Sequence, residues 1–117
     1  MKEANLILKM SYGFALDAAA AAISMCQRQE YDLACQFWRA STSIYANVEE
    51  ARAARSRADF KSKISIAAKE TRESIYWLRL ARDIGGLVQD NAESLLSKAS
   101  SIQKILTSIV KTTSENS

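Results

Sequence analysis

Apolar residues recur every three or four positions along almost the whole chain, the spacing expected for one buried face of an α-helix. Four such stripes predict helices over about residues 2–27, 33–55, 56–84 and 90–111. The connections between them are short, so neighbouring helices should run in opposite directions. The sequence therefore predicts an all-α fold, an antiparallel up-down-up-down four-helix bundle. The predicted core positions are Ile7, Met10, Phe14, Ala18, Ala21, Met25, Leu33, Phe37, Ala40, Ile44, Val48, Ala51, Phe60, Ile64, Ala67, Thr71, Ile75, Leu78, Leu95, Ala99, Ile102, Leu106 and Ile109.

Local signals mark where these helices start and stop. Residues 28–32 are predicted to form the first turn, with Asp32 as the N-cap of the second helix. Ser56, with an acidic residue three positions later, resembles a capping box that starts the third helix. The glycine pair at 85–86 should end that helix, and Asp90 should start the fourth.

Length and composition indicate one domain. We expect a single bundle over residues 1–111, followed by a flexible tail over 112–117. Gly13 lies inside the first helix and is interpreted as a close helix contact. Asp17 interrupts the apolar N-terminal run, and Glu3 stands where a secretory leader would be basic. We therefore expect an ordinary helix there, with no membrane span and no membrane partner.

A row of polar residues follows the second helix beside its core stripe: Gln36, Arg39, Ser43, Asn47 and Glu50. A matching flank of the third helix carries Asp59, Lys63, Ile66, Glu70 and Trp77. One interpretation is a solvated face with weak intrahelical pairs. The other is a partly buried network in which Arg39 pairs with Glu70 or Glu73, since half-buried charges need partners. Our hypothesis is that the row lines a helix–helix or subunit interface.

Three large aromatic residues fall outside the predicted core stripes. Trp38 and Tyr45 lie seven residues apart on the second helix, and Trp77 lies on the third. Single exposed aromatics are common, but three together favour contacts between subunits of an oligomer.

Positive charge gathers in the middle of the chain. The net charge is +3 with a pI near 9.0, and residues 51–82 hold nine Lys or Arg against three Asp or Glu. Basic residues around a tyrosine suit phosphate contacts with occasional base stacking. The same pattern is typical of any soluble basic helix face. The candidate nucleic-acid-binding residues are Arg52, Arg55, Arg57, Lys61, Lys69, Arg72, Tyr76 and Arg79.

The chain offers little for catalysis, and we expect no enzyme, no metal and no cofactor. Histidine is absent, which excludes His-based acid–base chemistry and His metal sites. Cys26 and Cys35 lack metal-type spacing and are expected to pack as small apolar residues. They also stand symmetrically about the first turn, a position compatible with contact across a helical hairpin. No glycine-rich phosphate loop is present.

The segment 37–87 resembles a known protein family. The first matching residues are Arg39, Ser43, Ile44, Ala46, Asn47, Val48, Glu50 and Ala51, and the second group is Phe60, Glu70, Glu73, Trp77 and Leu78. Together they are similar to the core of the bacterial four-helix-bundle family encoded in intervening sequences of 23S ribosomal RNA genes. Two positions depart from the family pattern. Tyr45 replaces a usually small residue, and Ala51 stands where many relatives have glycine.

The resemblance implies a cytoplasmic bacterial protein that assembles as a ring-like homopentamer. Such a pentamer is similar to the accessory protein of diversity-generating retroelements, which binds nucleic acid and a reverse transcriptase. The leading hypothesis is a non-enzymatic homo-oligomer whose basic surface binds RNA or DNA. The alternative is a scaffold or adapter that binds a partner protein, with the basic residues serving only solubility.

Overall fold

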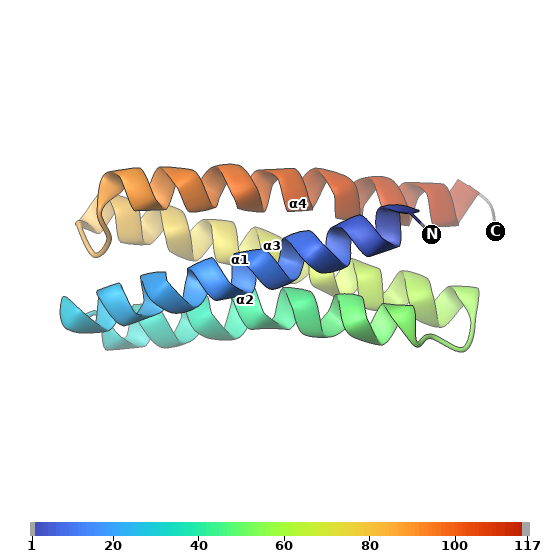
Figure 1. Ribbon diagram of the computed structural model, residues 1–117, viewed down its shortest axis with the longest axis horizontal. Coiled ribbons are helices and arrows are strands. Elements are labelled where there is room, and N and C mark those ends of the chain that lie inside the picture. Colours follow the sequence, from blue (N-terminus) through green and yellow to red (C-terminus); the bar gives the residue numbers. More distant parts are fainter. Residues whose placement is uncertain (1, 116–117) are drawn as a thin grey trace.

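The computed structural model describes the backbone of residues 2–115 and the side chains of residues 5–115. It contains four helices: α1 (Lys2–Gln27), α2 (Tyr31–Arg52), α3 (Arg57–Ile84) and α4 (Gln89–Glu115). They run alternately up and down in a rod of 46 × 20 × 19 Å (Figure 1). The predicted all-α antiparallel four-helix bundle is confirmed.

The order of the helices around the bundle decides which surfaces lie far apart. The packed pairs are α1 with α2, α2 with α3, α3 with α4, and α4 with α1. The helices α1 and α3 are therefore diagonal, and Figure 1 shows α1 in front with α3 behind it. The outward faces of α1 and α3 consequently point to opposite sides of the molecule.

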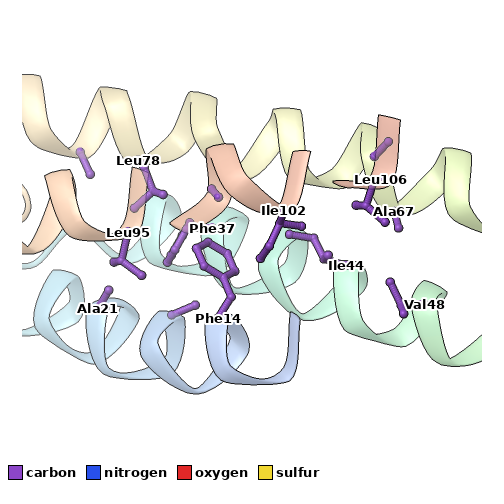
Figure 2. Packing of buried hydrophobic residues seen from close by; sticks show 14 of the residues in the cluster. Phe14, Ala21, Phe37, Ile44, Val48, Ala67, Leu78, Leu95, Ile102 and Leu106 are labelled. Carbon is purple, nitrogen blue, oxygen red and sulfur yellow. The ribbon is translucent and has the colours of Figure 1, made fainter. Parts of the chain in front are cut away.

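The core follows the predicted stripes closely. Large side chains from all four helices meet on the bundle axis, and the rings of Phe14 and Phe37 pack edge to face with centroids 6.4 Å apart (Figure 2). Met10, Phe60 and Ile75 pack at the margin of this cluster and are only partly buried. Burial of this apolar surface is the main source of the fold's stability.

Several small polar side chains also lie in the core. Each hydroxyl donates to a carbonyl one turn earlier on its own helix, which leaves no buried donor unpaired in this group. The residues are Ser11, Ser41, Thr71 and Ser74, with donor–acceptor distances of 2.6, 2.6, 2.8 and 2.9 Å.

Two predicted helix boundaries are confirmed. Ser56 has an extended backbone, and its Oγ accepts a hydrogen bond from the Asp59 amide at 3.0 Å, which caps α3. Gly85 ends α3 in the left-handed conformation at φ 77°. The amide of Gly86 then donates to the Ala81 carbonyl at 2.8 Å, which satisfies an orphan carbonyl at the helix end.

The predicted cap at Asp32 is wrong. The helix α2 starts at Tyr31, Glu30 occupies the cap position without a side-chain hydrogen bond, and Asp32 lies inside the first turn. The reason lies in the preceding turn, where Gln29 adopts a φ of 65°. This lets the Glu30 amide donate to the Met25 carbonyl at 2.9 Å, so the chain reverses earlier than expected.

Three other boundaries also differ from the prediction. The helix α2 ends at Arg52 rather than at 55, because residues 53–56 form the turn that places the Ser56 cap. The helix α4 starts at Gln89, one residue before the predicted Asp90. It also continues to Glu115, so residues 112–115 are helical rather than a loose tail. Residues 116–117 lie outside the described part of the chain.

The interpretation of Gly13 as a close helix contact is wrong, because a Cβ built there would meet nothing within 4 Å. We therefore expect Gly13→Ala to raise the free energy of unfolding by about 1 kcal/mol, since glycine costs that much relative to alanine inside a helix. Urea denaturation followed by far-UV circular dichroism checks this. Gly85→Ala is the contrasting variant and should lose about 1 kcal/mol, because its backbone is left-handed. A loss of stability in Gly13→Ala would contradict the open packing around α1.

The expectation about membrane spans needs a correction as well. Within the described residues one helix, Asn5–Gln27, is long and apolar enough to cross a membrane by length and composition. Its inner stripe, including Phe14 and Met25, is buried in the bundle. Only 28% of its most apolar stretch is buried, however. Much of the apolar surface of α1 therefore faces outward.

Candidate nucleic-acid interface and the polar network beside it

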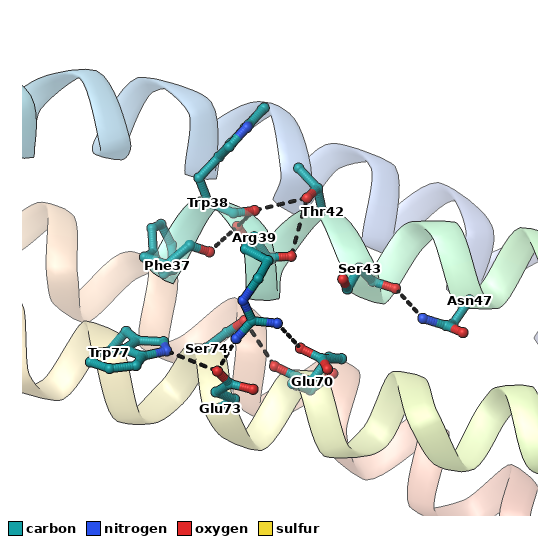
Figure 3. Close-up of polar contacts among 12 residues, drawn as sticks. Phe37, Trp38, Arg39, Thr42, Ser43, Asn47, Glu70, Glu73, Ser74 and Trp77 are labelled. Atoms are coloured by element: carbon teal, nitrogen blue, oxygen red, sulfur yellow. Dashed lines mark hydrogen bonds and ion pairs between the residues drawn. The ribbon is translucent and has the colours of Figure 1, made fainter. Parts of the chain in front are cut away.

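A single arginine joins α2 to α3. The Arg39 Nη1 donates to Glu70 Oε2 at 3.4 Å, and its Nη2 donates to Glu73 Oε1. The indole N–H of Trp77 donates to the same Glu73 oxygen at 3.3 Å (Figure 3). Positions 70, 73 and 77 share one side of α3 because they are spaced by three and four residues. The ion pair predicted between Arg39 and a carboxylate of the third helix is thus present.

Burial makes this network more than a surface ion pair. The Glu70 side chain is only 11% exposed, against 29% for Glu73 and 49% for Arg39. A carboxylate so far from water needs a charged or hydrogen-bonding partner. The wholly solvated interpretation is therefore wrong for these residues, and the row lines a helix–helix contact at this point.

The rest of the polar row does not cross to α3. Ser43 and Asn47 are partly buried, and Asn47 Nδ2 donates to the Ser43 carbonyl at 2.9 Å within α2. Gln36 and Glu50 are exposed. Among these five residues, Arg39 makes side-chain hydrogen bonds that reach the facing helix, and Asn47 pairs within α2.

The three predicted outer aromatics have different environments. Only Trp38 is exposed. Trp77 packs against the core cluster, and its ring lies 4.7 Å from that of Tyr76. Tyr45 turns toward α1, where its ring packs on Tyr12 at 5.2 Å. Tyr45 and Trp77 therefore lie outside the buried core, as expected, but both are partly covered by contacts within the bundle, which a single-helix projection does not show.

The hydroxyl of Tyr45 has its own acceptor. It donates to Glu49 Oε2 at 2.6 Å, and this hydrogen bond to a carboxylate raises the pKa of Tyr45 above its usual value. The same carboxylate also receives Arg52 Nη1 at 3.5 Å through its other oxygen. Arg52 is therefore engaged on the α1 side of α2.

The helix α3 carries an outward basic strip, defined as Lys61, Lys69, Arg72, Tyr76 and Arg79. At 100° per residue these positions fall within about 80° of one another around the helix axis. All are exposed except the partly buried Lys61. Between residues 58 and 79 this sector contains no acidic residue, and at 1.5 Å per residue the strip is about 27 Å long.

The three arginines at the α2–α3 turn are not all brought to this strip. Arg57 is exposed at the first position of α3, beside the strip's end, and Arg55 is exposed in the turn itself. Arg52 lies with Glu49 on the other side of α2, as its ion pair shows. The predicted arginine cluster therefore separates into two surfaces. Arg55 and Arg57 lie near the end of the strip, whereas Arg52 lies on the side of α2 that faces α1.

Two further lysines belong with the strip, although neither was a candidate from the sequence. Lys104 and Lys111 are exposed on α4. Around the axis of α4, Lys104 and Lys111 lie within about 20° of Glu93. The Oε1 of Glu93 pairs with Arg82 Nη1 of α3 at 3.2 Å. The two lysines therefore lie on the side of α4 beside α3. Their seven-residue spacing indicates that the two lysines share one side of α4. Their position near the strip, however, depends on the packing of α4 against α3.

Comparison with known proteins identifies the fold family. The family model described as "23S rRNA-intervening sequence protein" matches residues 3–108. The chain belongs to this family. It is also similar to a crystal structure of a protein of unknown function from the S23 ribosomal protein family of Bacteroides thetaiotaomicron. That similarity has 34% sequence identity and a TM-score of 0.89, covering 93% of this chain and 98% of the other. None of the curated proteins matches the chain.

The family resemblance and the basic strip rest on different residues of this intervening-sequence protein. Arg39, Glu70, Glu73 and Trp77, which carry much of the resemblance, form the network between α2 and α3. The strip contains none of the matching positions. The matching positions therefore help to hold the bundle together, whereas the exposed basic residues belong to the strip.

The two cysteines do not pack as buried apolar residues. Cys26 and Cys35 are exposed and unbridged, and both line a groove between α1 and α2. Among residues 5–115, no group of three or more Cys, Asp or Glu side chains is arranged to hold a metal ion.

Proposed function

We propose that this intervening-sequence family protein is a cytoplasmic, non-enzymatic homo-oligomer that binds RNA or DNA through the basic strip of α3. The observation that carries the proposal is the strip itself, a line of outward-facing Lys and Arg about 27 Å long, whose sector of α3 contains no acidic residue between positions 58 and 79. Lys104 and Lys111 widen it across α4.

The chemistry of the strip suits a phosphate backbone. Lysine and arginine donate charge-assisted hydrogen bonds to phosphate oxygens, and arginine can do so with two N–H groups at once. Each phosphate that is neutralised releases condensed counterions, which favours binding at low salt. The exposed Tyr76 ring supplies one face on which an unpaired base can stack.

Assembly would strengthen such binding. One subunit has a net charge of only +3, and one strip reaches few phosphates. Several copies in one particle make later binding events intramolecular, which raises the overall affinity without new chemistry. A homopentamer is the assembly that the family resemblance favours, and it completes the proposal.

The test compares two charge reversals of the same size on opposite sides of the bundle. Arg72→Glu is expected to weaken binding of a fluorescent RNA or DNA at least tenfold in anisotropy titrations. The slope of log affinity against log salt should become shallower by about one for every phosphate that is no longer neutralised. The control Lys9→Glu on α1, compared at an oligomer mass equal to that of the wild type, should leave both quantities unchanged. Equal effects of the two variants, or no binding by the wild type, would favour the alternative of a protein-binding scaffold.

A further inference from the structure

The outward face of α1 is unusually apolar for a surface helix. Leu16 and Ile23 expose 57% and 61% of their surface, and Tyr12 is also exposed. Between residues 10 and 27 the only charge is Asp17, which faces α4 and pairs with Lys98 Nζ at 2.6 Å. A helix on the surface of a monomer normally turns charged residues outward. From residue 10 to residue 27 the outward face of α1 lacks them.

A groove continues this face toward α2. Its volume is about 520 Å³. Ile23 borders it, and Trp38 extends from α2 toward α1, away from α3 (Figure 3). The groove is lined mainly by small or apolar side chains, among them Ala19, Ala22, Cys26, Ala34 and Cys35. The result is one continuous surface, here called the α1 face, that has large projecting residues beside a shallow apolar groove.

We infer that a second copy of this chain docks on the α1 face. This rests on the homo-oligomer part of the proposed function and not on nucleic-acid binding. Five large side chains are exposed over roughly half their surface, which gives on the order of 500 Å², more than half of a stable interface, and the groove between them adds to this area. Stable interfaces bury about 800 Å² per partner. The five are Tyr12, Leu16, Ile23, Tyr31 and Trp38.

The shape of the surface favours a copy of the same chain. Large side chains such as Leu16 and Ile23 project from the same face that holds the groove of alanines and cysteines. Small residues let helix backbones approach closely, so projecting residues of one copy can fill the groove of another. The position also fits, since α1 is diagonal to α3. Subunits that meet through α1 leave every basic strip in solvent.

The charge distribution argues against a membrane as the occupant. Anionic headgroups attract lysine and arginine, but the basic strip lies on α3, opposite the α1 face. An anionic bilayer would therefore draw the protein by the wrong side. The α1 face is apolar and contains a groove of small residues, which favours a second copy of the chain as its occupant.

Light scattering coupled to size-exclusion chromatography tests the inference. Wild-type protein is expected to elute as an oligomer, and Ile23→Lys as a folded monomer of 13.0 kDa. The lysine should not disturb folding because Ile23 is already mostly exposed, and circular dichroism verifies the helix content. Ile84→Lys, at a similarly exposed apolar residue at the end of α3, is the control and should keep the oligomer.

The thiols give a second readout. Cys26 and Cys35 line the groove, so their reaction with a thiol reagent should be slow in the wild-type oligomer and faster in Ile23→Lys. A monomeric wild type would overturn the inference, as would an Ile23→Lys protein of unchanged mass. Wild-type monomer that sediments with phosphatidylglycerol vesicles would assign the face to a membrane instead. Arg72→Glu should leave the mass unchanged, so failure of nucleic-acid binding is distinguishable from failure of assembly.

Discussion

Phe37→Ala is expected to lower the free energy of unfolding by about 3–5 kcal/mol, the usual range for removing a buried phenylalanine. Phe37 is fully buried on α2, and its ring packs edge to face on Phe14 of α1. Truncation removes the apolar surface and leaves a cavity that the rigid helices fill only in part. For a domain with a total stability of roughly 5–15 kcal/mol, such a loss is a large share. Urea denaturation followed by far-UV circular dichroism measures it.

The control for this experiment is Phe60→Ala. Phe60 lies near the start of α3 and is only partly buried against the core. Removing the same number of atoms there should cost clearly less, because water already reaches part of the ring and no closed cavity forms. If the two variants lost equal stability, the centre of the core would not lie where Phe14 and Phe37 meet.

Arg39→Ala is expected to destabilise the protein by about 1–3 kcal/mol, the cost of leaving a buried polar group without its partner. The variant removes the guanidinium that holds both Glu70 and Glu73. Glu73 keeps the Trp77 indole as a donor and is partly in solvent. Glu70 is nearly buried, so most of the destabilisation should come from its carboxylate.

A double-mutant cycle separates these contributions. Glu70→Gln removes the buried charge, so Arg39→Ala should cost less in that background than in the wild type. Gln36→Ala, an exposed position on the same flank of α2, is the matched control and should change stability little. The oligomer mass of Arg39→Ala should be measured alongside. No change in either stability or mass would remove the network from any interface.

Features that depend on a few neighbouring residues could be predicted from the sequence. The Ser56 cap and the Gly85 stop are local, because each depends on the conformation of one residue and the amides next to it. The core stripes were likewise predictable from a period of three and four. The Asp32 cap was not. Gln29 adopts a left-handed backbone that non-glycine residues seldom use, and this shifted the start of α2.

The candidate site was predictable only in part. The strip of α3 follows from helical periodicity, since its residues share one sector of a single helix. Arg52 seemed to belong to the same cluster because it is near in sequence, yet it pairs with Glu49 on another side of α2. Lys104 and Lys111 were missed for the opposite reason. They are distant in sequence and adjoin the strip only through the packing of α4 on α3.

By itself the sequence determined the helices, their inward faces and the basic sector of α3, because periodicity and capping act within one helix. The tertiary structure decided which helices are diagonal and where Arg39 finds its carboxylates. It also decided that the apolar outer face of α1 lies opposite the strip. These relations join residues that the chain places far apart, and they arise only when four amphipathic helices pack around one core to remove their apolar stripes from water.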